Sequence, residues 1–228
     1  MFIQIAKMKL LKTLPIFFVL LTSIAQAQAL EGVISYSIVY EVVQENRMDL
    51  EIYKAMIPQK MVLSIKDENS HLKFVGGMTQ GLLGDILYHS KDKNLYSIFD
   101  HNKTVTKTSV ETLKNNADKT GFTAVKTQEI SSILGYECTR FVVKDEKEGT
   151  ETSLWCTKAI SNASASVMVY FLESMTQYGV TGIEGLPLKI EFKGKEFDLI
   201  LSAQNKEVKT LSSTLFAIPE GYTLTKTN

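Results

Sequence analysis

Histidine, cysteine and acidic side chains are the groups through which this chain could perform acid–base, nucleophilic or metal chemistry. The three histidines, His71, His89 and His101, fall at strand ends or in turns, and none belongs to an HExxH or similar metal-ligand spacing. Carboxylates such as Glu129 and Glu137 are too scattered to nominate as an acid and a base. The sequence also has no GxSxG, Walker or GxGxxG motif. We therefore expect no enzymatic activity, no cofactor and no metal site, and a hydrolase would require a histidine to meet carboxylates in the folded chain.

The two cysteines, Cys138 and Cys156, flank a predicted hairpin with strands at Tyr136–Lys144 and Thr150–Lys158. A short loop at Glu146–Glu148 would place them directly opposite each other, with Cβ atoms ~5 Å apart and within reach of a disulfide. A loop register wrong by one residue would instead point the two side chains to opposite faces. A redox or metal pair is the functional alternative, but the spacing is not CxxC and no histidine joins it. We expect a structural disulfide.

The N-terminal 29 residues have the pattern of a cleavable export signal. Lys7, Lys9 and Lys12 form a basic start, and the apolar run Leu14–Ala25 is too short to span a bilayer. Small residues that suit cleavage lie at Ala25, Ala27 and Ala29. Residues 1–29 are thus expected to be removed, leaving one periplasmic or secreted domain at 30–228 without a membrane span.

The charge balance excludes some partners. The chain has 25 basic and 25 acidic residues, and the signal would remove three lysines, which leaves a mildly acidic protein. Such a surface does not predict binding to nucleic acid or to an anionic membrane.

Short strand-like runs dominate the exported part. Val33–Val43 alternates between apolar and polar residues, as a half-buried strand does. Further runs of this kind, separated by polar turns, lie at Lys60–Lys66, His71–Val75, Asp85–His89, Leu95–Phe99 and Thr104–Thr108. This spacing predicts antiparallel neighbours rather than strand–helix–strand units.

A hairpin near the C-terminus shows what such a sheet requires. Leu188–Lys193 and Glu196–Ala203 are joined by Gly194-Lys195, which suits a two-residue turn and predicts the pairs Ile190 with Leu199 and Phe192 with Phe197. One face of this hairpin is wholly apolar and must be covered.

Two helical stretches are available as the cover. Met48–Ile57 and Ala163–Tyr178 carry apolar residues at helical spacing, and Pro58 ends the first of them. The prediction is therefore an α+β fold that is mainly antiparallel β, with a curved half-barrel sheet wrapped around two short helices. Phe74–Leu83, with three glycines, is either a mobile flap or a turn.

Four short motifs resemble one family of exported bacterial proteins. They are ILGYEC at 133–138, LWCTK at 154–158, GLPLKIE at 185–191 and LFAIPEGY at 215–222. In order and spacing these are similar to the domain of unknown function 4412 (DUF4412) family, over a match from about Gly32 to the end. That family is in turn similar to the LolA and LolB lipoprotein carriers, which implies a LolA-like sheet around helices with a cavity for acyl chains. It has no assigned catalytic residues that could be carried over.

These observations favour a non-catalytic binding protein with an apolar cleft for a lipid, a lipoprotein acyl chain or a similar hydrophobic ligand. Methionines on the predicted helices would suit a variable apolar ligand, although gap filling in a packed core is the simpler explanation. The expected lining is Met48, Ile52, Met56, Phe171, Met175, Ile190, Phe192 and Leu199. The alternative is an envelope protein-interaction or stress-sensing module with a filled core, and the size of any apolar cavity discriminates between the two.

Overall fold

The computed structural model describes residues 30–42, 55–78, 80–120, 122–145, 149–160, 162–176, 179–195 and 197–226. The expected signal at 1–29 and nearly all of the first expected helix lie outside these residues. Of that helix, Ala55 and Met56 are described as helical, and the chain leaves the helix at Ile57, before Pro58. No helix among the described residues has the length and apolarity needed to cross a bilayer.

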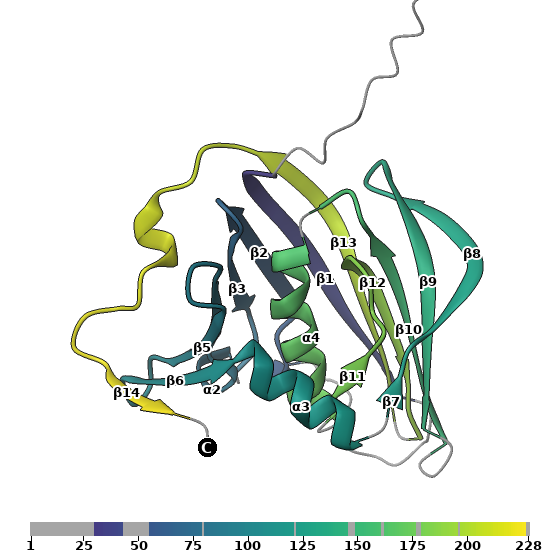
Figure 1. Ribbon diagram of the computed structural model, residues 1–228, viewed down its shortest axis with the longest axis horizontal. Helices are drawn as coiled ribbons and strands as arrows, with labels where there is room; N and C mark the ends of the chain where they lie inside the picture. The colour runs from purple at the N-terminus through teal and green to yellow at the C-terminus, as the bar shows by residue number, and fades with distance from the viewer. Residues whose placement is uncertain are drawn as a thin grey trace, which may run out of the picture.

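A 12-stranded sheet forms the body of the molecule (Figure 1). Its strand order is β14-β6-β5-β4-β3-β2-β1-β13-β12-β10-β9-β8, and the described pairs are antiparallel except that β14 runs parallel to β6. The strands are β1 (Gly32–Val42), β2 (Lys60–Lys66), β3 (Asn69–Val75), β4 (Asp85–His89), β5 (Asn94–Phe99), β6 (Thr104–Ser109), β8 (Val125–Ile133), β9 (Tyr136–Asp145), β10 (Thr150–Thr157), β12 (Leu186–Lys193), β13 (Phe197–Val208) and β14 (Thr223–Lys226). The mainly antiparallel prediction is therefore confirmed.

Short helices and a small second sheet accompany this large sheet. They are α2 (Gln80–Leu83), α3 (Val110–Thr120), α4 (Asn162–Thr176), the 3-10 turn η1 (Ser213–Phe216), and the parallel pair β7 (Phe122–Thr123) and β11 (Val180–Thr181). Figure 1 shows the sheet curving around α4, with α3 crossing beside it. The second expected helix is confirmed as α4. The exact half-barrel around two predicted helices is not established, because the first of them lies outside the described residues.

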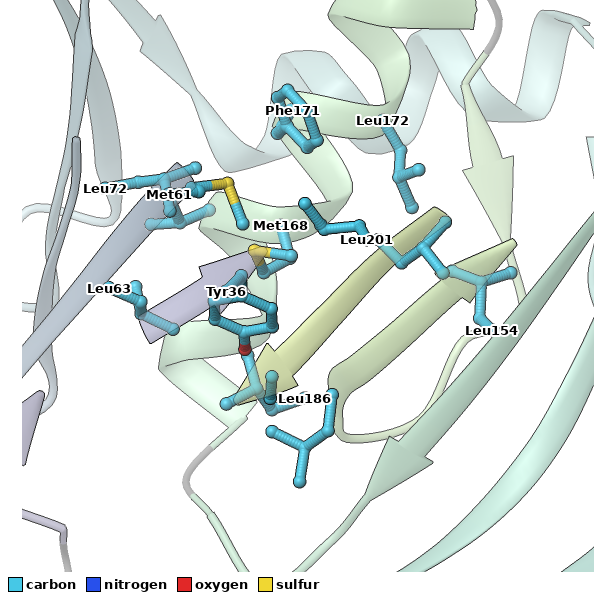
Figure 2. Close-up of a cluster of buried hydrophobic side chains, with 14 of the residues drawn as sticks. Tyr36, Met61, Leu63, Leu72, Leu154, Met168, Phe171, Leu172, Leu186 and Leu201 are labelled. Carbon is cyan, nitrogen blue, oxygen red and sulfur yellow. The ribbon is translucent and has the colours of Figure 1, made fainter. Parts of the chain in front are cut away.

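The main core lies between α4 and the inner face of the sheet. Val167 and Met168 of α4 are fully buried against side chains from both halves of the sheet, such as Leu63 of β2 and Leu201 of β13. Figure 2 shows Met168, Phe171 and Leu172 pointing from α4 toward these strands. At ~25 cal/mol per Å² of buried apolar surface, this shared core is the main stabilising contribution to the fold.

The opposite face of β4 to β6 is covered by the C-terminal segment. Leu87, Tyr96 and Ile98 form a second small core, against which Ile218 and Tyr222 pack. This segment is held by polar contacts at its start, where Leu211 accepts a hydrogen bond of 2.6 Å from Lys66 and donates one of 2.8 Å to Glu31. Both faces of these strands are therefore covered, which explains why β5 is buried nearly throughout.

The C-terminal hairpin has the expected strands but not the expected register. Ile190 lies opposite Leu201 and Phe192 opposite Leu199, two residues from the predicted pairing. The reason is that Gly194 flanks the turn, with its N–H donating to the Phe197 carbonyl at 3.2 Å. Because a shift of two residues preserves the face of every side chain, the predicted apolar face survives the error.

Candidate functional site

The residues expected to line an apolar cleft are brought together only in part. Phe171, Ile190, Phe192 and Leu199 border one pocket between α4 and the β12–β13 hairpin. Its volume is about 50 Å³, which holds a few water molecules but not an acyl chain. The structure does not describe Met48, Ile52 or the side chain of Met175. Met56 is 42% exposed.

The inner side of α4 is closed by close packing. Phe171, Ile190 and Leu199 are at most 6% exposed, and the rings of Phe74 and Phe171 lie 5.3 Å apart between centroids. Such packing leaves no space for a ligand without movement of α4. The predicted cleft is thus mainly a packed core in this structure.

A larger groove lies between α3, α4 and the segment from Val180 to Gly185. Its volume is about 670 Å³, within the range of pockets that hold small molecules. Seven of its fifteen lining residues are aliphatic and come from these elements and from the residues just before α4, namely Val110, Leu113, Ile160, Ala165, Val169, Val180 and Ile183. The groove therefore has the size that the pocket on the inner side of α4 lacks.

Local sequence explains how these elements are positioned. Ser109 caps α3, because its hydroxyl accepts a hydrogen bond of 3.0 Å from the backbone N–H of Thr112. The opposite wall is fixed by β11, where Thr181 accepts a hydrogen bond of 2.8 Å from the N–H of Ala124, beside the β7–β11 pairing. Sequence reasoning missed α3, although the Ser109 cap and the three-residue spacing of Val110 and Leu113 signal such a helix.

Charged residues stand at the rim of this groove. Lys158 and Glu184 form an ion pair of 2.5 Å, with side chains 65% and 54% exposed. The hydrogen bond and charge of Lys158, together with the charge of Lys126, hold the pKa of Glu184 below its ordinary value. Glu173 lies in the wall about two helical turns beyond Ser166, and burial raises the pKa of its carboxyl.

A second hollow of about 370 Å³ adjoins the groove and shares Lys158 and Glu184 with it. Its walls are more polar and include Lys126, Glu137 and Thr139 of β8 and β9. The Lys158–Glu184 pair therefore marks the boundary between an apolar compartment and a polar one.

The expected disulfide between Cys138 and Cys156 is wrong for this structure, in which both cysteines are free and buried. Asp145 faces Thr150, so the connecting loop is one residue longer than predicted, and Cys156 lies opposite Thr139. This one-residue shift removes the direct opposition on which the bond depended. Burial raises the pKa of Cys138 to about 11 and that of Cys156 to about 12, so both are protonated thiols at neutral pH.

The histidines do not converge on one site. His71 lies 3.1 Å from the Asp85 carboxylate, but Lys73 also approaches that carboxylate at 3.7 Å, and neither hollow described above reaches the pair. His89 contacts the Phe216 carbonyl, and His101 contacts the Gly81 carbonyl in α2. Among the described residues there is no group of three side chains suited to a metal ion. One histidine thus meets a carboxylate, as a hydrolase would require, but this pair lines none of the three hollows described above.

The glycine-bearing segment after β3 forms a turn followed by α2. Its apolar side chains face solvent, with Met78 81% and Leu82 61% exposed. The Met78 N–H donates to the Ala55 carbonyl at 3.0 Å, which ties the turn to the chain preceding β2. Neither of these side chains lines the groove or the adjoining hollow.

Comparison with known proteins confirms the family resemblance. A family model described as "Domain of unknown function (DUF4412)" matches residues 43–222. No curated protein matches the chain.

Several solved structures are similar in the course of the chain. PNGF-II is 15% identical with a TM-score of 0.44, and the match covers 86% of this chain but only 31% of PNGF-II, so this chain spans about a third of that protein. An uncharacterized conserved protein from Thermus thermophilus is 7% identical with a TM-score of 0.41, covering 86% of this chain and 91% of that one. The Mycobacterium tuberculosis lipoprotein LppX is 8% identical with a TM-score of 0.33, covering 80% and 89%.

Proposed function

We propose that this chain, which belongs to the DUF4412 family of domains of unknown function, is a non-catalytic binding protein for a ligand with a long apolar chain, such as a lipid. The observation that carries this proposal is the 670 Å³ groove between α3 and α4, with its aliphatic walls. Filling an apolar groove of this size with an apolar chain lowers the free energy, because apolar surface is removed from water. Export to the periplasm or the medium is part of the proposal, and rests on the sequence of residues 1–29.

The driving force would be the removal of apolar surface from water. Burial of one methylene group contributes about 0.8 kcal/mol, so each methylene inside the groove should tighten binding about fourfold. The loss of translational and rotational freedom offsets part of this gain, so short chains should bind weakly. No covalent step is needed.

A chain-length series tests the proposal. Titration calorimetry with saturated fatty alcohols of increasing length should show the affinity rising by about fourfold per methylene until the groove is full. Val169→Asp places a carboxylate in the groove wall and should abolish binding. Val125→Asp is the matched control, because Val125 is 65% exposed on the edge strand β8 and lines neither hollow.

The outcome can contradict the proposal in two ways. Absence of binding by the wild-type chain at every length would overturn it, and so would equal loss of binding in Val169→Asp and Val125→Asp. A folded Val169→Asp protein, verified by circular dichroism, is required for the comparison.

A protein-interaction or stress-sensing role is the second candidate. It is favoured by the closed inner side of α4 and by the exposed Met78 and Leu82 on the α2 segment. This role predicts that no fatty alcohol binds and that Leu82→Asp, rather than Val169→Asp, disrupts function.

A further inference from the structure

The boundary between the two hollows has charged side chains that a purely apolar ligand would not use. Lys158 and Glu184 border both hollows, and Lys126 lies in the wall of the polar one, close enough to lower the pKa of Glu184. The carboxylate of Glu184 therefore interacts with the positive charges of both Lys126 and Lys158.

We infer that the ligand is an anionic amphiphile, whose carboxylate or phosphate head binds between Lys126 and Lys158 in place of Glu184 while its chain fills the groove. This inference rests on the proposed function, since it concerns the head of the same ligand. Carboxylate and phosphate share the relevant chemistry, because both accept charge-assisted hydrogen bonds from lysine.

The exposed ion pair makes such an exchange feasible. Lys158 and Glu184 are each more than half exposed, and surface pairs of this kind contribute little to stability, so separating them costs little. Glu184 therefore acts as an internal anion that an incoming head group can replace. The groove then continues directly from the head position, because both hollows contain Lys158.

Two further charged side chains line the groove, Glu173 of α4 and Lys114 of α3. Glu173 stands farther along α4, away from Lys158, and would repel an anionic head there, whereas Lys114 is a single lysine against the two at the boundary. Glu137 lies in the wall of the polar hollow and limits how deep the anion can move. Thr139 and Thr157, in the same wall, carry hydroxyl groups that can also donate to an anion. The head is therefore expected at the rim, beside Lys126 and Lys158.

The test compares amphiphiles that share one alkyl chain and differ in the head. Titration calorimetry would use a fatty alcohol, the fatty acid and the monoalkyl phosphate, together with acetate and inorganic phosphate, which lack the chain. We expect the acid and the alkyl phosphate to bind about tenfold more tightly than the alcohol, and this advantage should shrink as salt is added. Acetate and inorganic phosphate should bind far more weakly, because neither fills the groove.

Substitutions at the boundary should change the affinity for the anionic amphiphiles in opposite directions. Lys126→Gln and Lys158→Gln should each reduce the ratio of the affinity for the acid to the affinity for the alcohol. Glu184→Gln should raise the affinity for the anions, because it removes their internal competitor. Lys91→Gln, in the exposed β4–β5 turn, is the matched control and should change neither affinity.

The possible results separate the two proposals. Equal binding of alcohol and acid, or a weaker affinity for the acid in Glu184→Gln, would overturn the anionic head while leaving apolar binding intact. Failure of all three amphiphiles to bind would overturn the proposed function itself. Tight binding of inorganic phosphate alone would show a simple anion site and would overturn the amphiphile.

Discussion

Replacing Tyr36 by phenylalanine tests the polar contact at the centre of the main core. Tyr36 is 1% exposed, and its hydroxyl donates a hydrogen bond of 3.1 Å to the carbonyl of Pro187 in β12. Burial raises the pKa of this phenol, so the hydroxyl remains a donor across the accessible pH range. In Figure 2 the Tyr36 ring lies between Met168 and Leu186, where phenylalanine would fit equally well. The substitution therefore removes the hydrogen bond while leaving the packing intact.

The expected cost follows from leaving a buried carbonyl without this donor. Such a loss destabilises a protein by about 1–3 kcal/mol, which is a large part of the stability of an ordinary domain. Urea unfolding followed by circular dichroism should show a lower midpoint and an unchanged slope.

The matched control is Tyr222→Phe, which removes an exposed hydroxyl that donates to Asp100 at 2.9 Å. Its midpoint should stay near that of the wild type, because water replaces the lost contact. A Tyr36→Phe protein as stable as the wild type, or no less stable than Tyr222→Phe, would refute the reasoning.

Two further predictions concern the backbone and the thiols next to the polar hollow. Gly185→Ala should be far more destabilising than Gly135→Ala in thermal unfolding: both glycines have positive φ, but a Cβ at Gly185 would meet the Thr157 carbonyl oxygen at 2.3 Å, whereas Gly135 has open space. Equal effects would contradict the close approach. Cys138 and Cys156 should resist iodoacetamide at neutral pH until urea unfolds the protein, when both become alkylated, because burial keeps them protonated. A protein that takes up no label even when unfolded would contradict the free thiols.

Strand positions could be predicted from the sequence because they depend on local pattern. Lys60–Lys66 and Asp85–His89 were expected with the bounds that β2 and β4 have in the structure. The alternation of apolar side chains in β1 likewise indicated its buried face, which includes Ile34, Tyr36 and Ile38.

Registers were less predictable, because a turn can close at more than one place. The hairpin at Gly194 moved by two residues and kept its apolar face, whereas the loop before Thr150 moved by one residue and separated the cysteines. A local sequence preference decides that a turn occurs, but the packing of both strands decides where it closes.

The groove could not be predicted, because its walls come from distant parts of the chain. Val110, Ile160 and Ile183 are separated by at least twenty residues, and each is an ordinary apolar residue within its own segment. Local signals exist for the helices α3 and α4 separately, such as the Ser109 cap before Val110 and Leu113, but not for their meeting in one groove.

The sequence by itself determined the antiparallel strands, the helix α4 and the family, because these follow from side-chain periodicity and short motifs. The tertiary structure alone decided that α4 closes the inner side of the sheet and leaves an open groove against α3, with Lys158 and Glu184 at its boundary. The physical reason is that a packed core and an open groove are lined by the same kinds of apolar residue. They differ only in whether another element reaches the same place in space.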